Sequence, residues 1–575
     1  MIVEHLDDLP FLAAQLNRCE LSNILDVHFP DHGHWKGISG GKLAFGWLLY
    51  ILSEGDHRLS HVEDWAELRL HSLGAILKEP QLRRTDFCDD RLARLLDRYS
   101  DDRRWGGFEK AIGRELLQVY QLDSAEDQST SQVKIVRTDS FNAPQYRDQG
   151  ELFRHGYSKQ RRSDQPFCKV MVSTLDPWAI PLAVDIVKGS GPDVDHYLPV
   201  IERVQSTLRN KGNLYVGDSQ LCSMPNRSAI HRAGDYYLCP LSKKQVLTDQ
   251  LDDYIAQIKV DIDKLPNIFT EPQSKRKPAY FYELKQTVKD QQNNIEWQER
   301  RILVYSPIYA QGLLKSLNNR LDEAEEKIQN LVIYKKGRRN PKTLKDLHTR
   351  VARIIKHYKV EDCFEVNCNQ VIEKILVKKY KDRPEEIREK ITLQLSIKRN
   401  KKYIELKRKR LAWQLYATNI PDEKMEAANL VKSYRDEYRI EHLFDYLINR
   451  EAVLLPIFLK REQRVKGLIR LLSLAMKFSM LIQYQIREKL AKSGQRLKGI
   501  YPGNKNRKTN NPTTPMLLRA FRGMAVVWLQ KEKNNSVEIT SLKEHQKTIL
   551  KLLGMDNVYR NILDILKAHP NLRET

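Results

Sequence analysis

The pattern of apolar and polar positions predicts a helical front, a strand-rich middle and a second, mainly helical half. Between residues 133 and 241, short β-rich runs alternate with helical stretches. The predicted order is three strands, a helix, a strand, a helix and a strand. The runs CKVMVSTLD and IPLAVDIV, joined through Asp-Pro-Trp, are typical of a hairpin. We therefore predict an α/β region with a mixed sheet, carrying a helix over 194–208.

Changes in composition divide the chain further. A polar, serine-rich stretch, LDSAEDQSTS, follows the helical front and has the composition of a linker. The region after the predicted sheet is highly charged, with long helical patterns, and apolar helical patterning returns near the end, where we expect a buried helix from 517 to 528. The expected regions are a helical N-terminal domain at 1–125, the first part of a sheet domain at 130–245, an inserted region at 246–412, a last part of the sheet domain at 413–470 and a helical C-terminal domain at 471–575.

Two aspartates stand at strand positions in the predicted sheet. Asp139 lies in RTDSF on the first strand, and Asp218 ends the short apolar run NLYVGD. Carboxylates on adjacent central strands can hold Mg²⁺ or Mn²⁺, which prefer hard oxygen ligands, and two such ions can clamp the reacting oxygens of a phosphodiester. The alternative is that both residues only cap strands or turns, as aspartate commonly does. Their order in the chain does not by itself favour the metal site.

A third carboxylate is suggested by a predicted helix from 421 to 444. On that helix Tyr434, Glu441 and Ile448 are spaced by seven and so share one face. If the helix packs on the sheet, Glu441 can join the two aspartates. The alternative is a surface glutamate in a charged helix.

The charge of the chain points to a polyanionic partner. Lysine and arginine total 97 against 74 acidic residues, a net charge of +23. Nucleic acid is the leading candidate, and an acidic membrane surface is the alternative. No run approaches the roughly 18 apolar residues that a spanning helix needs, and the N-terminus lacks the pattern of a secretory signal. We expect a cytoplasmic, nucleoid-associated protein that does not enter a membrane.

Basic residues interleaved with aromatics give the candidate DNA contacts. One cluster runs from Lys398 to Arg410, with Tyr403 inside it and Trp413 just after it, and such mixtures suit phosphate contacts with base stacking. The alternative is a solvated helix surface. The candidate residues in this cluster are Lys401, Lys402, Arg408 and Arg410.

A histidine pair in the N-terminal region is a second candidate metal site. His57 and His61 are four residues apart and would share a helical face with Asp64. The pair lacks the glutamate of a metalloprotease helix, so capping or packing is the favoured interpretation.

Several stretches in order resemble one family. These are RTDSF around Asp139, the block HGYSKQRRSDQPFCKVMVSTLDPWAIPLAVDIVKGSGPDVDHYLP at 155–199, LYVGDSQLCS around Asp218, and YRDEYRIEHLF followed by LPIFLKREQRVKGLIRLLSLAM around Glu441. GWLLYILSEGDHRLSHVEDWA near the front and NNPTTPMLLRAF near the end extend the likeness. Together they resemble the DDE-type transposases of bacterial insertion sequences, in the branch with a long insertion before the last catalytic acid.

The resemblance implies a fold, an activity and a site. The fold would be a ribonuclease-H-like mixed sheet with flanking helices, interrupted by a large insertion, plus helical N- and C-terminal regions. Asp139, Asp218 and Glu441 would be catalytic and bind Mg²⁺, with Mn²⁺ able to substitute. The enzyme would cut element ends and join 3′-hydroxyls to target DNA. Its partners would be double-stranded DNA, both the terminal inverted repeats and the target, and a second copy in a homodimer on DNA.

The same resemblance assigns phosphate contacts and shows two departures. Tyr434 matches the family's signature, and Lys159 and Arg161 could contact phosphate near the metals. Glu437 stands where the family usually has Arg, and Ile448 where it usually has Lys. A metal-dependent nuclease that cuts without joining and a catalytically inactive DNA-binding relative remain as alternatives.

Overall fold

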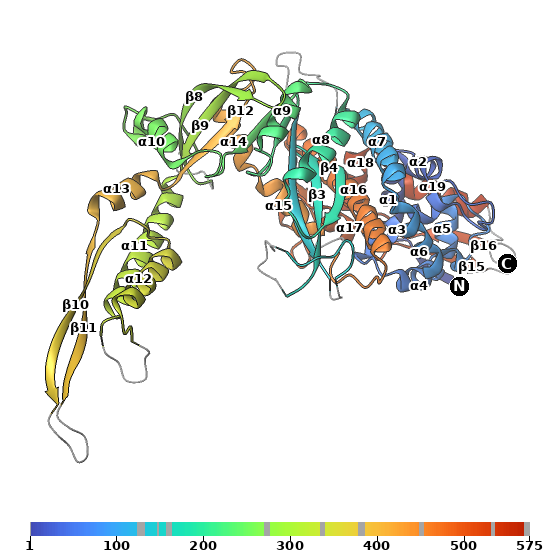
Figure 1. Cartoon of the computed structure of the whole chain (residues 1–575). Coiled ribbons are helices and arrows are strands. Elements are labelled where there is room, and N and C mark those ends of the chain that lie inside the picture. Colours follow the sequence, from blue (N-terminus) through green and yellow to red (C-terminus); the bar gives the residue numbers. More distant parts are fainter. Residues whose placement is uncertain are drawn as a thin grey trace.

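The chain is organised around one nine-stranded mixed sheet flanked by helices, with an extension that projects from the body (Figure 1). The computed structural model describes residues 2–122, 133–145, 149–156, 164–269, 276–333, 340–377, 386–447, 454–530 and 535–568. Within them the architecture is mixed α/β, as the sequence predicts. No helix in these ranges is both long enough and apolar enough to traverse a bilayer.

The first five strands of the sheet come from the predicted strand-rich region. Their spatial order is β4-β3-β2-β5-β6. The first three form an antiparallel meander, whereas β5 runs parallel to β2 and β6 runs parallel to β5. The predicted hairpin is confirmed as the β3–β4 pair. The bounds are β2 (Ile135–Pro144), β3 (Phe167–Leu175), β4 (Ile180–Lys188), β5 (Leu214–Val216) and β6 (Tyr236–Pro240).

Helices between these strands match the predicted alternation. The helix α8 (Val194–Leu208) has the bounds expected from the sequence and packs against β3 and β4. The helix α9 (Met224–Arg232) starts at Ser223, whose hydroxyl accepts a hydrogen bond from the backbone of Asn226, and packs beside β6. Every residue of β3 is buried, because helices cover this end of the sheet.

The rest of the sheet comes from the charged region that follows. After β6 the chain forms α10 (Thr248–Ala256) and then adds β7 (Asn267–Ile268), β8 (Ala279–Asp290) and β9 (Ile295–Tyr305). Later it returns as β12 (Trp413–Thr418), which lies between β6 and β9 and is antiparallel to both. Part of the region predicted as an insertion is thus built into the central sheet.

The remaining part of that region forms a projection that we call the arm (Figure 1). It consists of two helices packed on a long two-stranded hairpin, followed by a short basic helix that leads back to β12. The bounds are α11 (Pro307–Gln329), α12 (Leu344–Tyr358), β10 (Phe364–Val377), β11 (Glu386–Arg399) and α13 (Lys401–Arg410).

Helices from both ends of the chain pack together against the β4 side of the sheet. The long helix α16 (Glu462–Ser493) contacts α6 (Asp89–Tyr99) and β4. A Cβ on Gly467 would lie 2.2 Å from the carbonyl oxygen of Leu96, so glycine is what permits this close crossing. The other N-terminal helices are α1 (Leu9–Asn17), α2 (Leu21–His28), α3 (Gly40–Glu54), α4 (Val62–Glu67), α5 (Leu70–Leu77) and α7 (Asp102–Val119).

A three-stranded sheet also joins the two ends of the chain. The N-terminal strand β1 (Ile2–His5) pairs with β15 (Ala525–Gln530), which pairs with β16 (Asn535–Ile539). The helix expected from 517 to 528 is therefore wrong in its second half. The structure has α17 (Thr514–Arg519) followed by β15, because β15 finds strand partners that are remote in sequence. The last helices are α18 (Glu544–Leu553) and α19 (Val558–Ala568).

The single helix expected from 421 to 444 is wrong as well. The structure has two helices, α14 (Ala427–Arg435) and α15 (Tyr438–Asp445), separated by Asp436 and Glu437. The carboxylate of Asp436 is held by Arg439, at 2.8 Å, and by Arg276, at 2.7 Å. These contacts fix the turn between the helices, and Arg276 lies far away in the sequence.

Candidate active site

Asp139 and Asp218 lie at the same level on neighbouring parallel strands. In the β2–β5 pair, Arg137 is opposite Val216. Asp139 is two residues further along β2, and Asp218 is two residues beyond Val216, the last residue of β5. Both side chains are half-buried. The strand register therefore brings together the two acids that the sequence singled out.

A glycine shapes the chain just before Asp218. A Cβ on Gly217 would lie 2.9 Å from a methyl carbon of Leu221 and 3.2 Å from the carbonyl oxygen of Thr138. A larger residue would push the end of β5 away from β2. Gly217 thus allows Asp218 to sit close to the strand that carries Asp139.

Packing places α15 over the face of β2 that carries Asp139. Side chains two apart on a strand point to the same face, so Asp139 shares a face with Phe141. The ring of Phe141 packs on that of Phe444 in α15, with centroids 4.9 Å apart. Phe444 is one helical turn after Glu441, so both lie on the same side of α15. Glu441 itself is exposed.

A buried ion pair lies on the same face of β2 as Asp139 and connects this strand to α14. Arg137 Nε donates to Asp176 at 2.7 Å, and both side chains are almost fully buried. Arg137 also donates to the backbone carbonyl of Ser433 in α14. This arginine therefore ties β2 to the helix pair that carries Glu441.

Glu437 is a fourth carboxylate at this site, and we did not identify it as a site residue from the sequence. It is the residue before α15, half-buried. Burial raises its pKa to about 7, the negative charges of Asp139, Glu441 and Asp218 add to this, and Arg137 acts in the opposite direction. Its spacing of four from Glu441 was the available signal, because residues four apart share a helical face.

Tyr197 is the second residue that sequence reasoning missed. It lies on α8, is buried, and its hydroxyl donates to Asp218 Oδ1 at 2.8 Å. Burial raises the pKa of Tyr197 well above its ordinary value, and the charges of Asp218 and Asp139 raise it further. The tyrosine therefore stays protonated and orients Asp218. No signal in the sequence relates it to the aspartates.

The donor set suits a hard divalent cation, although the carboxylates are not drawn tightly together. Among the described residues, no three His, Cys, Asp or Glu side chains are grouped so that they could hold a metal ion as they stand. Burial is the main cause of the raised pKa of Glu437, and the negative charges of Asp139, Glu441 and Asp218 lie near enough to Glu437 to add to it. Carboxylate oxygens are the ligands that Mg²⁺ and Mn²⁺ prefer, and such an ion would relieve this repulsion.

No protein-family model matches the sequence, and no curated protein matches it either.

The residues predicted to contact DNA differ in how exposed they are. Tyr434 is half-buried in α14 with its ring 4.4 Å from that of Tyr416. Lys401 and Lys402 are exposed at the start of α13. Lys159 and Arg161 lie outside the described residues.

The two arginines predicted in the same cluster are engaged by neighbours. Arg410 binds Asp252, with Nε 2.6 Å from Oδ1. Arg408 is exposed and donates to Asn318 at 3.1 Å. The two lysines are therefore better placed than Arg410 to meet a phosphate.

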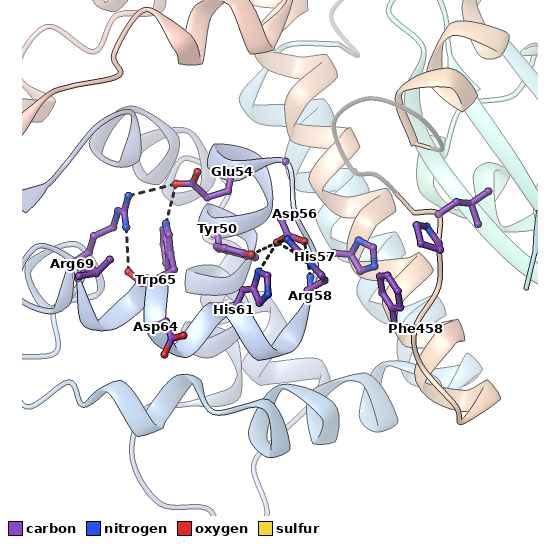
Figure 2. Close-up of a pocket in the computed structure, with 14 residues that line it drawn as sticks. Tyr50, Glu54, Asp56, His57, Arg58, His61, Asp64, Trp65, Arg69 and Phe458 are labelled. Carbon is purple, nitrogen blue, oxygen red and sulfur yellow. Dashed lines mark hydrogen bonds and ion pairs between the residues drawn. The ribbon is translucent and has the colours of Figure 1, made fainter. Parts of the chain in front are cut away.

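A cavity of about 850 Å³, whose lining includes none of these carboxylates, lies between the N-terminal helices and the segment at Leu455, Pro456 and Phe458 (Figure 2). It contains the histidine pair weighed as a metal site. Asp56 accepts a hydrogen bond from Tyr50 at 2.6 Å and lies 3.3 Å from His61 and 2.9 Å from Arg58. Burial alone would raise the pKa of Asp56, but the hydrogen bonds from Arg58 and Tyr50 lower it below its ordinary value.

The backbone of this region does not place the two histidines on one helical face. The helix α3 ends at Glu54, with Gly55 in the left-handed conformation. His57 lies in the loop that follows, and His61 ends a short 3₁₀ turn. These polar side chains line the cavity and bind one another, in keeping with the packing interpretation.

Proposed function

We propose that this protein is a metal-dependent DNA strand transferase of the DDE transposase type. The observation that carries the proposal is the parallel pairing of β2 with β5, which ends two residues before Asp139 and Asp218, together with the packing of α15, the helix of Glu441, on β2. These are the three residues that the family resemblance assigns to catalysis.

The strand order supports a ribonuclease-H-like core. Counted along the chain, the first five sheet strands lie in the order third, second, first, fourth, fifth. The first three are antiparallel, and the last two run parallel to the first. In such a sheet, the acids on the first and fourth strands are neighbours. The resemblance noted in the sequence implies this arrangement, with an insertion before the last acid.

The roles of the residues follow from their positions. Asp139, Asp218 and Glu441 would hold two Mg²⁺ ions, with Mn²⁺ able to substitute. When bound, the ions supply positive charge that stabilises the attacking and leaving oxygens of the phosphodiester. Tyr197 holds the carboxylate of Asp218 in place. Arg137 anchors α14, the helix before the one that carries Glu441, to β2.

The excess of basic residues favours DNA as the partner of this protein. The net charge of +23 favours binding to duplex DNA, with the terminal inverted repeats and the target as the two DNA partners. Lys401 and Lys402 on α13 are the exposed lysines that we assign to phosphate contacts. We propose that the enzyme works as a homodimer on DNA in the cytoplasm, associated with the nucleoid.

The test is incubation of the protein with a labelled duplex carrying its element end and a target plasmid. Reactions contain Mg²⁺ or EDTA, and the Glu441→Ala variant and the exposed-site control Glu423→Ala run beside the wild type. With Mg²⁺, we expect the wild type and Glu423→Ala to give cleaved and joined products and Glu441→Ala to give neither. With EDTA, none of the proteins should give products. Cleavage without joining would favour a nuclease, and tight binding without any cut would favour an inactive DNA-binding relative.

A further inference from the structure

A stretch of the C-terminal region carries positive charge that no acidic residue balances. Between Glu488 and Glu532 the sequence has ten lysines and arginines and no aspartate or glutamate. Acids make up 74 of the 575 residues, so their absence here is a local departure from the composition of the chain. Five of the ten basic residues belong to one short hairpin: Arg496, Lys498, Lys505, Arg507 and Lys508.

The hairpin is fixed to the body of the protein. Its strands are β13 (Leu497–Lys498) and β14 (Lys508–Thr509), which run antiparallel. Leu497 is buried in the main core, and β13 packs beside α18. A Cβ on Gly499 would lie 3.3 Å from the side chain of His545 in α18, so glycine permits this close approach. The hairpin therefore presents one face to the body and the other to solvent.

The loop of the hairpin is held in shape by its own side chains. The side-chain oxygen of Asn504 accepts a hydrogen bond from the backbone of Arg507 at 3.1 Å. The guanidinium of Arg507 lies over the ring of Tyr501, with its central carbon 4.2 Å from the ring centroid. Arg507 is thus held in one position and is still exposed.

The outward face of the hairpin consists of basic side chains. Successive side chains on a strand point to opposite faces, so Lys498 points away from the side on which Leu497 is buried. Arg496 shares the face of Lys498, and Lys508 is directly opposite Lys498 in the strand pair. All three basic side chains are exposed, and none forms an ion pair with a described acid. We call this surface the basic face; with the two loop residues it consists of Arg496, Lys498, Lys505, Arg507 and Lys508.

The opposition of Lys498 and Lys508 is unfavourable for the hairpin alone. Residues directly opposite in an antiparallel pair lie about 5 Å apart, and like charges in this arrangement destabilise the pair. A nearby exposed lysine is arranged differently, since Lys492 on α16 lies 3.0 Å from Glu488. A ligand with several negative charges would relieve the repulsion between Lys498 and Lys508. The basic face therefore has the arrangement of a surface that binds a polyanion.

We propose that the basic face binds the phosphate backbone of duplex DNA, separately from the contacts assigned to α13. The choice of DNA among polyanions rests on the proposed function, whereas the charge of the face does not. An anionic membrane fits less well, because the aliphatic side chains of the hairpin, Leu497 and Ile500, are buried and leave nothing to insert between lipids. Single-stranded DNA also fits less well, because its bases stack on open aromatic rings and Arg507 covers the ring of Tyr501.

Binding of this kind should not depend on the DNA sequence. Contacts from lysine and arginine to phosphates position a duplex but do not read its bases. The basic face would therefore hold DNA of any sequence. Each phosphate contact would add to the salt dependence of binding, because it releases counterions from the DNA.

The test is fluorescence anisotropy of a labelled duplex of arbitrary sequence with the full chain, in EDTA, over a series of salt concentrations. Lys498→Gln/Lys508→Gln should reduce the logarithmic salt slope by about two units, one for each lysine. The matched control Lys492→Gln/Lys547→Gln removes the same charge from the neighbouring helices α16 and α18. Each of these two lysines already has a glutamate partner, so the control should leave the slope unchanged.

Charge reversal separates a loss of binding from a loss of folding. Lys508→Glu places opposite charges across the hairpin, so the melting temperature of this variant should be at least that of the wild type. The variant should nevertheless bind the duplex more weakly than Lys508→Gln does, because a negative charge then faces the phosphates.

An unchanged salt slope in Lys498→Gln/Lys508→Gln, or an equal fall in its control, would overturn the proposal. So would a loss of binding to phosphatidylserine vesicles with duplex binding intact, which would assign the basic face to a membrane, or a loss confined to a single-stranded probe. These measurements contain no divalent metal, so their outcome does not depend on cleavage. A protein that binds duplex DNA as expected but gives no cleaved product would refute only the proposed catalysis.

Discussion

Glu437→Gln should make the protein more stable at alkaline pH and leave its stability unchanged in acid. The pKa of Glu437 is raised from the ordinary 4.5 to about 7 by burial, with added repulsion from Asp139, Glu441 and Asp218. Glu437 therefore keeps its proton in the folded state up to about pH 7, whereas the unfolded chain releases it near pH 4.5. The stability that this difference provides is complete below pH 4.5 and is lost as the pH rises through 7.

The size of the effect follows from the same difference in pKa. One pKa unit corresponds to about 1.4 kcal/mol, so the full difference amounts to about 3 kcal/mol of unfolding free energy. Solvent screening of a half-buried group reduces this, and we expect about 2 kcal/mol at pH 8. Replacing the carboxyl by a neutral amide of similar size removes the ionisation and with it the penalty.

The assay is denaturant unfolding of the wild type and Glu437→Gln, followed by tryptophan fluorescence at several pH values between 4 and 8. Glu423→Gln, which alters an exposed carboxylate between β12 and α14, is the matched control. The variant should gain stability over the wild type only as the pH rises, and Mg²⁺ should narrow the gap at pH 8. A difference that does not change with pH would refute the clustering of carboxylates around Glu437.

Three further predictions address other parts of the structure. Glu299 is fully buried and binds Arg227 and Arg301, each at 2.5 Å. Glu299→Ala should therefore lower the unfolding free energy by about 3–5 kcal/mol in a denaturant titration. The control Glu423→Ala should change the unfolding free energy little in the same titration. Tyr197→Phe, which removes the hydrogen bond to Asp218, should slow cleavage about 10- to 100-fold with DNA affinity retained. An unchanged cleavage rate would show that Tyr197 has no role in positioning Asp218. Lys401→Gln/Lys402→Gln should reduce the salt dependence of DNA binding by about one unit of logarithmic slope per lysine, whereas Arg410→Gln, whose native side chain is bound to Asp252, should leave the slope unaltered in fluorescence anisotropy.

Helices and strands were predictable where all the residues that determine them lie within the segment itself. The helix at Val194–Leu208 and the β3–β4 hairpin follow from apolar spacing and from turn residues that lie within the segment itself. The break between α14 and α15 does not, because Asp436 is held partly by Arg276 from a distant segment. The pairing of β1 with β15 is equally remote, so the strand was missed and a helix was expected there.

The sequence allowed the acidic residues of the candidate site to be predicted, but not the neighbouring residues that contact them. Asp139 and Asp218 stand out in the sequence because each follows or lies in a strand-like run, and the β2–β5 pairing ends two residues before each of them. Which helix residues approach them depends on how α8 and α15 pack, and this brings Tyr197 and Glu437 to the site. The charged strands β8 and β9 join the same sheet through partners that only the folded chain reveals.

The most direct test of the central claim measures metal binding at the carboxylates. Mn²⁺ bound to the protein in complex with a DNA duplex can be counted by electron paramagnetic resonance for the wild type, Asp139→Asn, Asp218→Asn and the control Glu423→Gln. A two-metal carboxylate site predicts bound Mn²⁺ in the wild type and the control, and its loss in both aspartate variants. Equal Mn²⁺ binding in all four proteins would contradict the assignment of Asp139 and Asp218 as metal ligands.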